Sequence, residues 1–113
     1  MQQTIDLSRF RKPQTARIFA GRPRGEAVRD DVHLAQLIAD DQVEEINVIV
    51  PVDIFQITSS FFLGMFGDAI RALGADAFRR RFRFQGKDIQ DVIEEGIADA
   101  LNFSSALQAN GRL

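Results

Sequence analysis

A short run of apolar residues at positions 46–50, Ile-Asn-Val-Ile-Val, constrains the fold more than any other part of the chain. Four of its five residues, all but Asn47, are β-branched, so the run is rich in strand formers. A nearly all-apolar strand is typical of one that is covered on both faces of a parallel sheet. Pro51 follows at once, and because proline has no amide N–H to donate, strand pairing should fade there.

Apolar residues recur at helical spacing on both sides of this strand. The strongest stripe is Phe62, Phe66, Ala69, Ile70 and Leu73, and Gly74 stands where a helix C-cap glycine belongs. A second stripe covers residues 26–41, and a third covers residues 89–101, where Asp88 can cap the start of the helix. Residues 16–20 and 82–84 have strand patterns. The order strand, helix, repeated three times, predicts an α/β fold with helices packed on a small, largely parallel or mixed sheet.

The amino-acid composition excludes several kinds of functional site. It has no cysteine, which excludes a disulfide framework and a thiolate metal site, and its one histidine, His33, leaves little for a histidine-centred site. We expect no metal, no cofactor and no membrane span, and a cytoplasmic location fits best. Ten Phe with no Tyr or Trp indicate packing rather than hydrogen-bonded recognition by aromatic rings.

Charge is arranged in blocks. Residues 1–29 carry seven Lys and Arg against two acids, whereas residues 30–53 carry seven acids and no base. Residues 54–87 carry six bases against two acids, and residues 88–113 carry five acids and one Arg. Alternating blocks neutralise one another within a fold or between copies of it, so a nucleic-acid partner is not the first interpretation.

Three hydroxyl residues, Thr58, Ser59 and Ser60, stand directly before the strongest helical stripe. Ser59 or Ser60 is expected to cap that helix by accepting a hydrogen bond from a backbone amide. A second interpretation makes this corner a phosphoacceptor or partner contact, because a phosphate is tolerated at a helix start. A third makes one serine a nucleophile, although His33 is the single imidazole that could serve as its base.

Two groups of arginines are candidate contacts. Gly21 to Gly25 is predicted to be a turn that positions Arg22, Arg24 and Arg29 at a helix start, where they could also bind an anion or a partner. Arg79, Arg80, Arg81 and Arg83 form the densest basic run, with Phe82 and Phe84 between and after them. Basic residues interleaved with aromatic rings can bind single-stranded nucleic acid, which is the alternative function for this strand.

Three segments, taken in their order along the chain, resemble the STAS-like family of small bacterial domains. These domains are distant relatives of the sulphate-transporter and anti-sigma-factor-antagonist fold. The three segments are Gly21-Arg22-x-x-Gly25-x-x-x-Arg29, then Ile57-Thr58-Ser59-Ser60-Phe61 with Phe66-Gly67, and Leu73-Gly74 leading through Phe78 to the arginine-rich strand. In the antagonists, the matching corner carries an Asp-Ser-Ser-Gly motif whose second serine is phosphorylated by a partner kinase. The resemblance places Thr58 on the Asp, Ser59 and Ser60 on the serines, and Phe61 on the Gly.

The resemblance implies a domain over residues 16–102, after an N-terminal arm or irregular first strand at 1–15 and before a flexible tail at 103–113. It implies a non-catalytic regulatory or scaffolding module that acts by protein–protein contact. Its partner would be a kinase-like or anti-sigma-like regulator, contacted or switched at Thr58, Ser59, Ser60 and Phe61. A homo-oligomer is a further expectation. A small serine hydrolase is the other alternative, and it would lose activity on Ser60→Ala.

Overall fold

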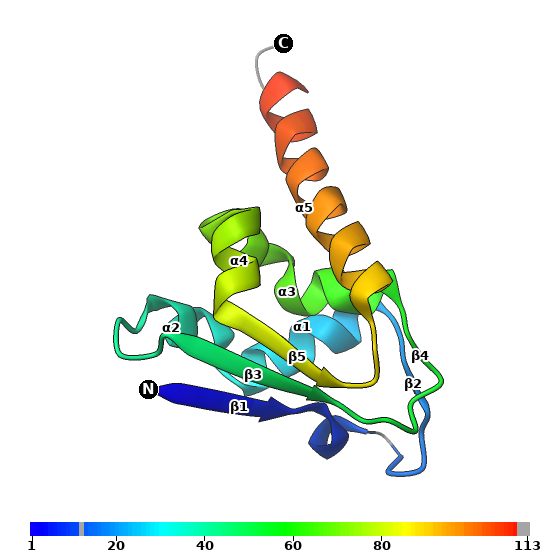
Figure 1. Ribbon diagram of the computed structural model, residues 1–113. Coiled ribbons are helices and arrows are strands. Elements are labelled where there is room, and N and C mark those ends of the chain that lie inside the picture. The colour runs from blue at the N-terminus through cyan, green and yellow to red at the C-terminus, as the bar shows by residue number, and fades with distance from the viewer. Residues whose placement is uncertain (12, 111–113) are drawn as a thin grey trace.

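A computed structural model describes residues 1–11 and 13–110 of the chain, with side chains described as far as residue 102. Its centre is a sheet of three parallel strands, β1 (Gln2–Asp6), β3 (Glu45–Val50) and β5 (Phe82–Gly86), in the order β1-β3-β5 (Figure 1). The register places Ile5 beside Val48 and Val48 beside Phe84. The predicted α/β fold with a small parallel sheet is therefore confirmed, and the run at 46–50 is its middle strand.

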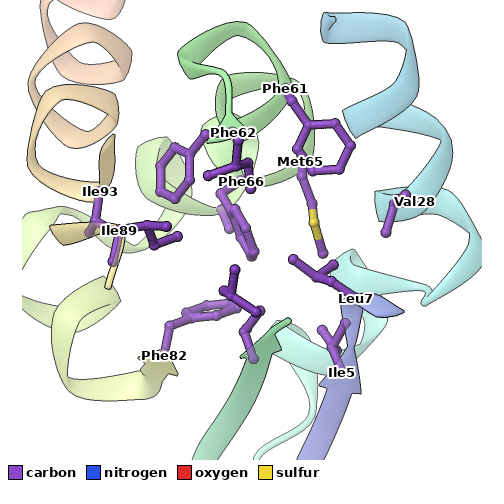
Figure 2. Packing of buried hydrophobic residues seen from close by; sticks show 14 of the residues in the cluster. Ile5, Leu7, Val28, Phe61, Phe62, Met65, Phe66, Phe82, Ile89 and Ile93 are labelled. Atoms are coloured by element: carbon purple, nitrogen blue, oxygen red, sulfur yellow. The ribbon is translucent and has the colours of Figure 1, made fainter. Parts of the chain in front are cut away.

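The helices bury one face of this sheet. Helix α3 (Ser59–Leu73) packs against both α1 (Arg22–Asp31) and α5 (Gln90–Asn110). Figure 2 shows Met65 and Phe66 of α3 pointing toward the strands that carry Ile5 and Phe82, whereas Phe62 points toward α5, which carries Ile93. Along β3 every second residue is buried, namely Ile46, Val48 and Val50, whereas the residues between them are half-exposed. The prediction that this strand is covered on both faces was therefore wrong.

Phenylalanine rings fill the space between α3 and the sheet. Phe66 is fully buried, and its ring centroid lies 5.0–5.9 Å from those of Phe62, Phe78, Phe82 and Phe84. Most of these pairs are tilted or edge-on, which is the favourable arrangement for aromatic rings. The stripe predicted for this helix does face the core, and these rings pack rather than project into solvent.

A second, very small sheet pairs β2 (Ile18–Phe19) with β4 (Gln56–Ile57) in parallel. Each of these strands leads within a few residues into a long helix, β2 into α1 and β4 into α3. Because the two strands are parallel and in register, they bring the N-termini of α1 and α3 to the same place. This pairing creates the corner at which the sequence places its hydroxyl residues.

The single helix predicted over residues 26–41 is two helices. Helix α1 begins at Arg22, so the predicted turn at Gly21 to Gly25 is in fact its first turn, preceded by Gly21 at a φ of 90°. The helix stops where His33 takes a left-handed conformation with a φ of 54°, and α2 (Leu34–Ala39) follows. A residue in this conformation ends a right-handed helix, and the apolar stripe continues through it because both helices face the same core.

The basic run is not one strand. Helix α4 (Ala75–Arg81), which the sequence analysis missed, contains Arg79, Arg80 and Arg81, and β5 begins only at Phe82. Gly74, with a φ of 84°, ends α3 and starts α4, so the predicted C-cap is confirmed but leads directly into another helix. Phe78 is fully buried and anchors α4 to the ring cluster.

The terminal segments are more regular than predicted. Residues 1–15 include the strand β1 and a 3₁₀ turn, η1 (Leu7–Phe10), in which Leu7 is fully buried, so this segment belongs to the core. Asp88 accepts a hydrogen bond of 3.0 Å from the amide of Gln90, as expected for the start of α5. The backbone of α5 continues to Asn110, past the predicted boundary at 102, and projects beyond the rest of the fold (Figure 1). Residues 111–113 of the predicted tail lie outside the described residues.

Candidate interaction site at the corner of α1 and α3

Thr58 is the residue that caps α3. Its backbone is extended, and its Oγ1 accepts a hydrogen bond of 3.2 Å from the amide of Phe61. The cap role that the sequence analysis gave to Ser59 or Ser60 therefore belongs to Thr58. The same Oγ1 also lies 3.3 Å from the amide of Gly21, the residue before α1, which donates to it. One hydroxyl thus ties the starts of both helices together.

Ser60 is the exposed hydroxyl of the corner. Its Oγ lies 3.1 Å from Thr58 Oγ1, and its side chain is open to solvent, whereas Ser59 is half-buried. Phe61 is fully buried, with its ring centroid 5.2 Å from that of Phe19. Phe61 can therefore shape the corner only from beneath, and it is not itself a surface that a partner could touch.

Helices α1 and α3 approach so closely at this corner that their backbones touch. A Cβ atom on Gly64 would lie 2.3 Å from the carbonyl oxygen of Arg22, and one on Gly25 would lie 2.1 Å from that of Phe61. Ser60 stands four residues before Gly64 and so on the same face of α3, one turn away. The backbone of Arg22 consequently lies beside the turn that carries Ser60.

The three arginines predicted to share one site are separated by the fold. Arg22 is exposed in the first turn of α1 at the corner. Arg24 turns away and donates a hydrogen bond of 2.8 Å to the carbonyl oxygen of Phe10. Arg29, at the other end of α1, pairs with Asp30 at 3.0 Å and with Asp68 at 3.2 Å. The hydrogen bond from Arg29 to Asp30 raises the pKa of its guanidinium above the ordinary value.

Three of the four arginines of the basic run, Arg79, Arg81 and Arg83, bond within the chain, whereas Arg80 is exposed. Arg79 pairs with Glu94 at 2.7 Å, and Arg83 lies 3.4 Å from Glu45. Arg81 donates to the backbone carbonyl oxygens of Leu37, Ile38, Asp40 and Val43. Phe82 is buried and Phe84 is half-buried against the ring of Phe66, so both rings take part in the packing of the core.

The histidine and the exposed serine lie at opposite ends of α1. Ser60 is beside the first turn of α1, and His33 follows its last turn. A helix of ten residues is about 15 Å long, far beyond hydrogen-bond reach. His33 instead lines a hollow of about 560 Å³ between α2 and α3, whose walls include Leu34, Ile38 and Ala69. No sequence pattern indicates this hollow, because it depends on the break in the helix at His33.

No family model, curated protein or solved structure matches this chain. Among the described residues, no group of three or more His, Cys, Asp or Glu side chains could hold a metal ion. None of the helices in the described part of the chain is both long enough and apolar enough to cross a bilayer.

Proposed function

We propose that the chain is a non-catalytic regulatory or scaffolding module of the cytoplasm that acts by protein–protein contact at the corner of α1 and α3. The contact surface comprises Arg22 and Ser60, with Ser59 and the capping Thr58 behind them. Ser60 is its phosphoacceptor, and the partner is a kinase-like or anti-sigma-like regulator. The resemblance of the three sequence segments to the STAS-like family supports this assignment of roles.

The observation that carries the proposal is the meeting of two helix N-termini around one exposed hydroxyl. Ser60 lies in the first turn of α3 and beside the first turn of α1, where Gly21 and Thr58 are joined by a hydrogen bond of 3.3 Å. Helix N-termini carry partial positive charge, and Arg22 adds a full one. A phosphate of about −1.5 to −2 charge would be stabilised here without disturbing the fold, while changing what the surface attracts.

The test compares three variants that are folded to the same extent as the wild type. Ser60→Asp adds a negative charge at the phosphate position, Ser60→Ala removes the hydroxyl, and Asn102→Asp adds the same charge at an exposed position of α5 as a control. Proteins retained from a bacterial lysate by the wild type are identified, purified and titrated against each variant. We expect Ser60→Asp to change the affinity at least about tenfold. Ser60→Ala and Asn102→Asp should leave the affinity unchanged, and equal affinities for all four proteins would refute the switch.

A further inference from the structure

The outer edge of β1 is free. Among the described residues, β1 pairs with β3 alone, so the backbone N–H and C=O groups on its other side have no strand to bond. A free edge of this kind pairs readily with another chain unless it is guarded by charges, proline or a bulge. β1 reads Gln-Gln-Thr-Ile-Asp and carries one charge, at its last residue.

The other edge of the sheet is guarded. β5 carries Arg83, has Gly86 at a φ of 95° at its end and is followed by Lys87. Charged side chains of this kind are how natural edge strands resist pairing. Each strand carries one charge, but Arg83 lies inside β5 and Asp6 is the last residue of β1, so β1 is the strand better able to accept a partner.

A groove of about 420 Å³ runs along the free edge. It is lined by Gln3, Thr4, Ile5 and Asp6, which alternate between the two faces of the sheet, so the hollow follows the strand itself. Its other wall comes from η1 and from the junction of α1 with α2. This wall combines the half-buried apolar side chains of Phe10, Val32 and Leu37 with the charged side chains of Arg9 and Asp31. An added strand would have both backbone partners and apolar surface in this groove.

The sequence of β1 is complementary to itself in an antiparallel pair. When two copies are related by a two-fold axis at Thr4, Thr4 faces Thr4 of the second copy, and Gln3 faces Ile5. Gln2 then faces Asp6, so no like charges oppose each other. Paired threonines are among the favourable cross-strand neighbours, and an isologous pair repeats every contact twice.

We propose that the chain forms a homodimer by antiparallel pairing of β1 with β1 of a second copy, which joins the two sheets into one of six strands. The partner is the same chain, and the pairing is centred on Thr4. Its contacts are backbone hydrogen bonds and apolar packing in the groove, and it does not depend on the corner of α1 and α3.

The experiment measures the mass of the full chain by sedimentation equilibrium over a concentration series from low micromolar to near millimolar. Thr4→Lys places two ammonium groups opposite each other at the centre of the pair, on an exposed position that folding tolerates. We expect its dimer dissociation constant to rise at least roughly tenfold over that of the wild type. Thr4→Val keeps a β-branched side chain and should leave the dimer intact.

Gln85→Lys is the matched control, because it adds the same charge to an exposed position on the same face of the other edge strand. It should leave the dimer intact, and circular dichroism should show all three variants folded. A wild-type chain that stays monomeric throughout the series would overturn the proposal. So would a dimer that Thr4→Lys does not weaken, or one that Gln85→Lys weakens as much.

Discussion

At the scale of single residues, two glycines of α3 that look alike in the sequence have different surroundings. A Cβ on Gly64 would meet the backbone of α1, with the carbonyl oxygen of Arg22 at 2.3 Å, and backbone cannot move aside cheaply. A Cβ on Gly67 would meet only the tip of Arg71, at 3.2 Å, which can turn away. The two glycines cannot be told apart from the sequence, because the neighbours of each are set by the fold.

Gly64→Ala should therefore destabilise the protein by about 3 kcal/mol, because it forces α1 and α3 apart. Gly67→Ala should be close to neutral, since the higher helix propensity of alanine, about 1 kcal/mol, offsets a small local adjustment. Urea unfolding followed by circular dichroism measures both free energies. Equal losses for the two variants would contradict the close crossing of the helices.

At the scale of elements, one arginine holds a helix and a loop in place. Arg81, at the end of α4, donates hydrogen bonds to carbonyl oxygens from Leu37 to Val43, at distances of 2.6–3.2 Å. These carbonyls belong to the end of α2 and the turn that leads into β3. Helix α2 is only six residues long, which is too short to be stable alone. The hydrogen bonds from Arg81 therefore supply stability that the helix lacks by itself.

Arg81→Lys should loosen that segment, because an ammonium cannot reach several carbonyls with the spread of a planar guanidinium. We expect amide hydrogen exchange in α2 to accelerate by at least roughly tenfold, as the loss of one or more charged hydrogen bonds implies, while exchange in β3 stays slow. Arg80→Lys is the control, since Arg80 is exposed and neighbours Arg81 in the same helix. Unchanged exchange in α2 would show that Arg81 is not its anchor.

At the scale of the whole molecule, the charge blocks are neutralised partly within one chain. Acids of the 30–53 block pair with bases from other blocks: Asp30 with Arg29, Glu45 with Arg83, and Asp53 with Arg11, where one Nη–Oδ distance is 3.0 Å. Asp30 and Asp53 are largely exposed and Glu45 is partly exposed, so each pair adds little stability by itself. Hydrogen bonds from Arg11 and Arg79 hold the pKa values of Asp53 and Glu94 below their usual range.

These shifts fix the direction of the pH dependence. A carboxylate with a lowered pKa in the folded state stabilises the fold above its unfolded pKa, near 4, and this contribution is lost as the pH falls through the folded value. The free energy of unfolding should therefore decrease as the pH is lowered below about 4. Asp53→Asn should reduce the steepness of that fall, measured by urea unfolding at a series of pH values. A fall as steep as that of the wild type would contradict the Arg11–Asp53 coupling.

Elements whose signals are local could be predicted from the sequence alone. The apolar run at 46–50, the stripe from Phe62 to Leu73 and the cap at Asp88 each predict a feature that the structure contains, because periodicity and capping act over a few neighbouring residues. The α/β class followed from their order. The hydroxyl corner could also be located, since Thr58, Ser59 and Ser60 precede a strong helix.

How these elements pack against one another depends on contacts between residues that are distant in the chain. The left-handed His33 and the short helix α4 depend on packing, which overrides weak local preference. The uncovered face of the sheet follows from where the helices lie, and a strand as apolar as β3 does not reveal it. Which hydroxyl caps, which arginine stays at the corner and which edge remains open are all set by contacts between residues distant in sequence, such as Gly21 with Thr58. Such contacts produce no periodic pattern in the sequence. The position of the candidate site could therefore be predicted from the sequence, but the arrangement of its side chains could not.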